Sequence, residues 1–107
     1  MGISLIYMTA ANREQASALA RSLVESRLAA CANLMDGVTS TYWWEGKVVE
    51  EQEVVIIAKT RADLVEALIA QVKAEHSYAC PCVVAVPITT GNADFLAWVA
   101  AETLKKA

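Results

Sequence analysis

The chain concentrates its metal-type ligands in one short segment, Glu75-His76-Ser77-Tyr78-Ala79-Cys80-Pro81-Cys82, which holds its only histidine and two of its three cysteines. Imidazole nitrogen and thiolate sulfur are ligands of soft and borderline metal ions. Cys80 and Cys82 are two residues apart, so on an extended segment both side chains point to one face, with His76 as a third ligand from the preceding turn. Cysteine also packs as a small apolar residue. Metal binding, packing and redox chemistry therefore remain open for this pair.

Two further groups of residues could contribute to a site. Tyr42, Trp43 and Trp44 form an aromatic cluster, which suits either a subunit interface or a platform on which a planar ligand stacks. Glu50, Glu51 and Glu53 follow it, and strand alternation separates Glu50 from the other two. We expect a solvated hairpin arm there, with Glu53 near Lys59 as the part that contributes to a cleft.

Length and composition limit the class of protein. The 107 residues suit one domain, 1–107. Hydrophobic residues make up 56% of the chain, above the usual share of about 45–50%, which indicates self-association. The net charge is -3 and the nine basic residues are scattered, so nucleic acid is not an expected partner.

The ends and the cysteine content predict the compartment. The sequence starts without a positively charged region ahead of an apolar stretch, and no stretch reaches the ~20 apolar residues of a membrane span. Three cysteines without a secretory signal favour reduced thiols over a disulfide framework. We therefore expect a cytoplasmic protein that does not contact a membrane.

Periodicity predicts the elements that must position these residues. Residues 3–9 suit a buried strand, and Asn12 suits the N-cap of an amphipathic helix that ends near Ala30, with Cys31 at its end. Residues 32–60 suit a long hairpin with a bend or bulge at Asp36-Gly37 and a tight turn at Glu45-Gly46. A helix around 64–72, a strand at 82–88 and a final helix around 95–99 complete the chain. This order predicts an α+β, ferredoxin-like split βαβ fold with a four-stranded antiparallel sheet and an added C-terminal helix.

One strand of this sheet indicates how the chain associates. Residues 54–58 are continuously apolar, so both faces of the strand should be shielded from water. The helices can cover only one face. We therefore predict an obligate oligomer in which a neighbouring subunit covers the other face.

Several motifs resemble those of the CutA family, the divalent-cation-tolerance proteins. They comprise residues 23–25, Arg27-Leu28-Ala29-Ala30-Cys31-Ala32-Asn33, Tyr42-Trp43-Trp44-Glu45-Gly46-Lys47, Lys59-Thr60, His76, Tyr78, Pro81, Pro87-Ile88 and Gly91-Asn92. The resemblance runs almost from end to end. It implies a homotrimer similar to the PII signalling proteins, a cytoplasmic setting, and a role linked to copper and other divalent cations. It implies no chemical reaction, so we expect no enzyme.

The resemblance also implies where a ligand would bind. Cleft residues in this chain would be Cys31, Trp44, Glu53, Lys59 and Tyr78. Copper ligands of some family members match Met8, Glu75 and His76, of which only His76 keeps its type. Where the family usually has His-Pro-Tyr-Glu-x-Pro-Glu, two acidic positions become Ala79 and Cys82, so the metal candidates here are Met8, His76 and Cys82.

Three hypotheses follow from these observations. The first is a regulatory protein whose inter-subunit clefts bind a metal ion such as copper, or a small molecule. The second is an acylphosphatase-like hydrolase, which needs a phosphate-binding loop after the first strand; residues 9–13 provide Arg13 but no glycine-rich loop. The third is a structural trimer without a ligand.

Overall fold

A computed structural model describes residues 2–103. Its four strands are β1 (Ile3–Ala10), β2 (Cys31–Trp44), β3 (Lys47–Arg61) and β4 (Val83–Ile88). They form one sheet in the order β2-β3-β1-β4, and every neighbouring pair is antiparallel. The helices are α1 (Arg13–Glu25), α2 (Val65–Glu75, after a 3-10 turn at Ala62–Leu64) and α3 (Ala93–Glu102). The predicted ferredoxin-like α+β fold is confirmed.

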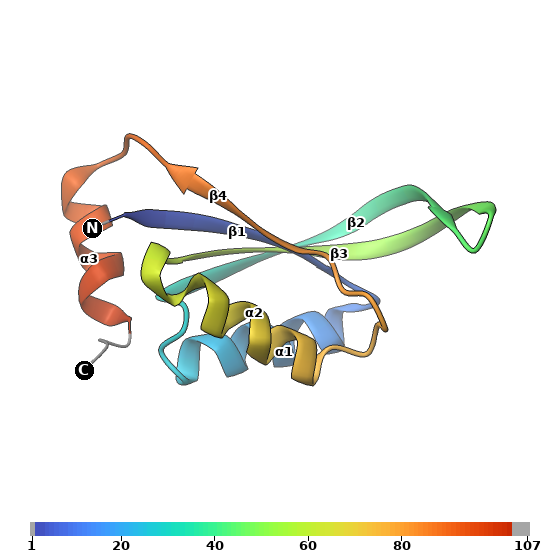
Figure 1. Cartoon of the computed structure of the whole chain (residues 1–107), viewed down its shortest axis with the longest axis horizontal. Coiled ribbons are helices and arrows are strands. Elements are labelled where there is room, and N and C mark those ends of the chain that lie inside the picture. Colours follow the sequence, from blue (N-terminus) through green and yellow to red (C-terminus); the bar gives the residue numbers. More distant parts are fainter. Residues whose placement is uncertain (1, 104–107) are drawn as a thin grey trace.

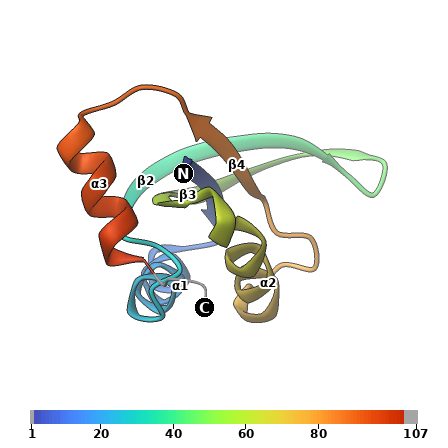
Figure 2. The same ribbon diagram turned by 60° about the vertical axis from the view of Figure 1, so that its left-hand side comes forward.

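The helices leave much of one sheet face open. Helices α1 and α2 lie side by side on one face, and α3 lies at the end of the sheet where β1 begins (Figures 1 and 2). The main core lies between the sheet and α1 and α2, and its fully buried side chains include Ile6, Met8, Leu23, Ile56, Leu68 and Val72. No helix within residues 2–103 has the length and apolar character needed to cross a membrane.

Helix α1 begins as predicted but ends earlier. The Asn12 side chain caps it by accepting a hydrogen bond of 2.9 Å from the Gln15 N–H. The helix ends at Glu25, not near Ala30, because Arg27 adopts a left-handed conformation with φ 63°.

A turn after α1 accounts for the wrong helix end. The N–H groups of Leu28 and Ala29 both donate to the Leu23 carbonyl, over 3.0 and 3.1 Å. Leu28 is thereby returned to the core, where it is buried. Leu28 therefore fits the apolar spacing of α1, although its backbone is no longer helical. Cys31 was expected at the end of the helix; it is instead the first residue of β2.

The hairpin of β2 and β3 follows the predicted signals and projects beyond the other strands (Figure 1). The register shifts between Met35 and Val38, where Gly37 has φ 74°, which is the predicted bulge. At the tip, Glu45 and Gly46 have φ values of 49° and 79°. Positive φ at both central residues is the geometry of a two-residue turn that matches strand twist.

The sheet face opposite α1 and α2 is strongly apolar. The register places Val84 and Val86 of β4 beside Tyr7 and Leu5 of β1, and the two valines are 50% and 51% exposed. Strand β4 starts at Val83, not at the predicted Cys82, because its pairing with β1 starts at Met8↔Val83. Cys82 is consequently left on the segment that precedes the sheet edge.

Candidate functional site

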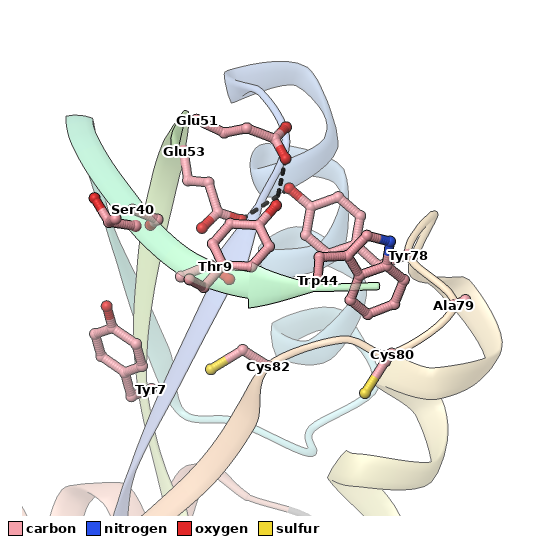
Figure 3. Close-up of a pocket in the computed structure, with 12 residues that line it drawn as sticks. Tyr7, Thr9, Ser40, Trp44, Glu51, Glu53, Tyr78, Ala79, Cys80 and Cys82 are labelled. Atoms are coloured by element: carbon pink, nitrogen blue, oxygen red, sulfur yellow. Dashed lines mark hydrogen bonds between the residues drawn. The ribbon is translucent and has the colours of Figure 1, made fainter. Parts of the chain in front are cut away.

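A pocket of about 590 Å³ lies on the open face of the sheet, at the base of the hairpin. Its floor comes from β1 with Tyr7 and Thr9 and from β3 with Glu51 and Glu53. Strand β2 contributes Ser40, Thr41, Tyr42 and Trp44, and the segment before β4 contributes Tyr78, Ala79, Cys80 and Cys82 (Figure 3). Three parts of the sheet and one connecting segment therefore converge here.

Each of the two carboxylates in the pocket accepts a hydrogen bond from a tyrosine. The Tyr78 hydroxyl donates to Glu53 Oε2 over 2.8 Å, and the Tyr42 hydroxyl donates to Glu51 Oε1 (Figure 3). Glu53 is only 8% exposed, so Tyr78 supplies polar contact that water cannot readily supply. Glu53 was expected to contribute to a cleft, and strand alternation turns it toward the pocket.

The pairing changes the acidity of both phenols. The hydrogen bond to Glu51, followed by burial, raises the pKa of Tyr42 to about 12. Burial first, and then the hydrogen bond to Glu53, raises the pKa of Tyr78 well above its ordinary value. Both phenols are therefore neutral donors at physiological pH. Among residues 2–103, no Lys or Arg side chain lines this pocket, so its electrostatic character favours a cation.

Residues 78–82 form one wall of the pocket and include two cysteines, Cys80 and Cys82. Cys80 and Cys82 are exposed and unpaired with each other, and both line the pocket (Figure 3). Burial and then the charge of Glu53 raise the pKa of the Cys82 thiol, partly offset by a hydrogen bond with Thr9. A thiol of raised pKa is less often a thiolate at neutral pH and is therefore a weaker nucleophile.

His76 holds this wall against the sheet. Its Nδ1 accepts a hydrogen bond of 3.0 Å from the Tyr78 N–H. Nε2 therefore carries the ring proton and donates to the Thr9 carbonyl over 2.7 Å. The His76 ring also lies against the Tyr78 ring, with 4.6 Å between centroids. Because both nitrogens are occupied, His76 positions Tyr78 and offers no free lone pair to a metal.

The predicted cleft residues divide into two groups. Trp44, Glu53 and Tyr78 meet in the pocket. Cys31 and Lys59 are register partners elsewhere on the sheet, where Lys59 Nζ donates to Asn33 Oδ1 over 2.6 Å. The expectation that Glu53 lies near Lys59 is wrong within one chain, because six residues along a strand span roughly 20 Å.

The predicted metal candidates do not converge on one point. Met8 is fully buried in the core beneath α1 and α2, whereas Cys82 lines the pocket on the opposite face. His76 also faces a smaller pocket of about 240 Å³ with Gln15 and Glu75. Within the described part of the chain, no three His, Cys, Asp or Glu side chains are grouped closely enough to hold a metal ion.

Sequence reasoning missed four pocket residues, which are Ser40 and Thr41 of β2 and Tyr7 and Thr9 of β1. For the β1 pair the signal was present, because Tyr7 and Thr9 alternate along the strand with the core residues Ile6, Met8 and Ala10. Alternation places them on the opposite face of the sheet. What the sequence did not indicate is that residues 78–82 fold over this part of the face.

Comparison with known proteins identifies relatives along almost the whole chain. The family model described as CutA1 divalent ion tolerance protein matches residues 4–102. The chain is 44% identical over 99 residues to Protein CutA 1, chloroplastic, of Oryza sativa, covering 92% of this chain and 56% of that protein. It is 42% identical over 99 residues to the divalent-cation tolerance protein CutA of Thermus thermophilus, covering 92% and 96%. The chain thus spans little more than half of the plant relative but nearly all of the bacterial one.

Solved structures agree with the sequence relatives. The crystal structure of CutA1 from Oryza sativa superposes with a TM-score of 0.96 at 42% identity, covering 99% of this chain and 97% of that chain. The structure of the periplasmic divalent cation tolerance protein CutA from Archaeoglobus fulgidus superposes with a TM-score of 0.90 at 40% identity, covering 94% and 97%. The chain belongs to the CutA1 divalent ion tolerance protein family.

Proposed function

We propose that this protein contributes to divalent-cation tolerance by binding a divalent cation or a small cationic ligand in the pocket beside Glu51 and Glu53. The observation that carries the proposal is the pair of carboxylates held in place by neutral tyrosine donors. A carboxylate that accepts one hydrogen bond keeps further lone pairs for a cation. The wall of Trp44, Tyr42 and Tyr78 gives the same pocket aromatic faces, which attract cations.

The working form of the protein is proposed to be a homotrimer of the PII-like kind that the sequence resemblance implies. The exposed valines of β4 and the apolar side chains of β1 beside them support association, since an apolar face of this kind is stabilised by a partner. In such a trimer, Cys31 and Lys59 of one subunit would approach the pocket of the next. That arrangement would reunite the cleft residues that are separated within one chain.

Binding and regulation fit the site better than catalysis, and we infer that the protein is not an enzyme. The phenols and the Cys82 thiol all have raised pKa values, whereas an activated nucleophile needs a lowered one. The acylphosphatase-like alternative is not favoured, because Arg13 pairs with Asp36 over 2.8 Å on the surface. The three free thiols suit a reducing compartment, and we propose the cytoplasm.

If the bound ion is copper, fewer of the predicted metal candidates can reach it than the sequence implied. Met8 would have to leave the core to reach a pocket ion, and His76 would have to give up a hydrogen bond. Cys82 is the one predicted metal candidate that already faces the pocket. We therefore assign the divalent ion primarily to the carboxylates.

Calorimetric titration with Zn²⁺ and Cu²⁺ tests the proposal. We expect Glu53→Gln to lower the affinity by about tenfold or more, because a charged oxygen ligand is lost. Glu50→Gln is the matched control, since Glu50 is on the same strand but does not line the pocket. His76→Ala and Cys82→Ala test the copper version. Equal affinities in the native protein and Glu53→Gln would refute the carboxylate site.

A further inference from the structure

The pocket beside Glu51 and Glu53 is much larger than a bare ion requires. Its volume of about 590 Å³ falls within the range of about 300–1,000 Å³ that is usual for sites of small organic molecules. Within residues 2–103, His, Cys, Asp and Glu side chains form no group of three that could hold a metal ion. The two carboxylates alone would therefore leave most of an ion's coordination to water. A ligand that matches the whole pocket must fill more of it than an ion does.

One oxygen of the Glu53 carboxylate can still bind a ligand. Glu53 is 8% exposed, and its Oε2 accepts the hydrogen bond from Tyr78. Its Oε1 accepts no hydrogen bond from the described residues. Among these residues, the one fully enclosed side-chain oxygen or nitrogen without a partner is Thr60 Oγ1, so Glu53 Oε1 keeps a surface that a ligand can reach. A carboxylate buried to this extent is stabilised by a charged donor, and no Lys or Arg of the described chain lines the pocket to supply one.

The walls of the pocket are aromatic. Tyr42 and Trp44 come from β2, and Tyr7 and Tyr78 complete a set of four ring side chains (Figure 3). Tyr42 is 37% exposed and Trp44 is 47% exposed, so both rings are open to a ligand. Because the Tyr42 and Tyr78 hydroxyls donate to Glu51 and Glu53, two of the rings are held beside the negative charge. Aromatic rings of this kind both attract cations and cover flat apolar groups.

We infer that the pocket binds a small primary amine, with its ammonium group beside Glu51 and Glu53 and a flat apolar body against Tyr42 and Trp44. A primary ammonium has three N–H donors. In this arrangement one donates to the open oxygen of Glu53, and the others donate to Glu51 and to the Ser40 hydroxyl, which the register places opposite Glu51. The inference rests on the function proposed above, because it names the chemical class of the cation at the same two carboxylates.

Calorimetric titration of the native protein with phenethylamine, in an amine-free buffer such as phosphate, tests the inference. Two matched probes each lack one part of the recognised chemistry. Phenethyl alcohol keeps the ring but has no charge, and ethylamine keeps the charge but has no ring. We expect one phenethylamine per chain, and affinities for the other two that are lower by about tenfold or more, because a charge-assisted hydrogen bond or a ring contact is lost. Equal affinities for phenethylamine and phenethyl alcohol would overturn the inference.

Variants connect binding to the two parts of the pocket. Glu53→Gln should lower the affinity for phenethylamine by about tenfold or more and leave that for phenethyl alcohol unchanged. Trp44→Ala should weaken the binding of both ring-bearing probes. Glu50→Gln is the matched control, since Glu50 does not line the pocket. Circular dichroism establishes that each variant is folded, and Glu51→Gln replaces Glu53→Gln if the latter does not fold. An unchanged phenethylamine affinity in the folded carboxylate variants would contradict the inference.

The same measurements separate this inference from the function on which it rests. If phenethylamine does not bind, while Zn²⁺ binds and does so more weakly in Glu53→Gln, the organic ligand is wrong and the divalent-cation form of the proposed function stands. If phenethylamine binding depends on Glu53 and Zn²⁺ binding does not, the inference stands and the two carboxylates form a site for an organic cation. If neither ligand depends on Glu53, the inference and the proposed function are both wrong.

Discussion

At the scale of single residues, the pocket depends on a carboxylate that the fold has removed from water. Glu53 is almost buried and accepts a hydrogen bond from Tyr78. The backbone N–H of Tyr78 in turn donates to His76, whose ring donates to the Thr9 carbonyl. This chain of contacts links the segment before β4 to the first strand. The site is therefore stabilised by the same contacts that shape it.

Removing the Tyr78 hydroxyl should destabilise the protein. Tyr78→Phe leaves the Glu53 carboxylate buried without its donor, and an unsatisfied buried group costs about 1–3 kcal/mol. Urea denaturation at a fixed protein concentration measures the change in the free energy of unfolding. Tyr42→Phe is the control, because Tyr42 and Glu51 are both exposed and the loss there should be smaller. An equal loss in the two variants would contradict this account of Glu53.

The same tyrosines should make stability fall at high pH. Both have pKa values raised in the folded state, Tyr42 to about 12, against about 10 in an unfolded chain. Between these values the folded state holds more protons, so stability decreases as pH rises. The contribution is complete below pH of about 10 and is lost as pH rises through the folded-state pKa values. Urea midpoints measured upward from pH 9 should decline less steeply in the double variant Tyr42→Phe, Tyr78→Phe; parallel declines would contradict the assignment.

At the scale of elements, the local signals in the sequence were the dependable ones. Asn12 caps α1, Gly37 marks the bulge and Glu45-Gly46 makes the turn, because each depends on a few neighbouring residues. The end of α1 was mispredicted because Leu28 packs in the core by a route other than helical continuation. The spacing of apolar residues predicts which side chains are buried, but it does not predict the backbone conformation at those residues.

The hairpin tip offers a test of that local control. Gly46 has φ 79°, and a Cβ there meets no atom within 4 Å, so Gly46→Ala should cost about 1 kcal/mol through backbone conformation alone. Glu45 also has positive φ, and Glu45→Asn should raise stability, since Asn tolerates that region better. Thermal unfolding of the two variants measures both effects. Changes of the same sign would show that the turn geometry is not what limits stability there.

At the scale of the whole molecule, the separation of site residues was beyond the reach of sequence reasoning. The resemblance grouped Cys31 and Lys59 with Glu53, and one chain places them apart. Strand register and the path of residues 78–82 decide which side chains meet, and both depend on long-range packing. The apolar run of β3, in contrast, predicts cover of the second sheet face from the alternation of side chains alone, and cover by another subunit stays a prediction.

The open face gives the last prediction, which concerns the assembly. Val86 is 51% exposed on β4 beside Leu5 of β1, so Val86→Glu places a charge where we propose that a second subunit packs. Burying an unpaired charge is costly, and light scattering should show a decrease from the mass of three chains toward that of one. Val48→Glu is the control, because Val48 is 60% exposed on the hairpin arm and its side chain points to the other face. If Val86→Glu keeps the native mass, this face does not form the interface. The proposal that Cys31 and Lys59 of one subunit approach the pocket of the next would then have no support.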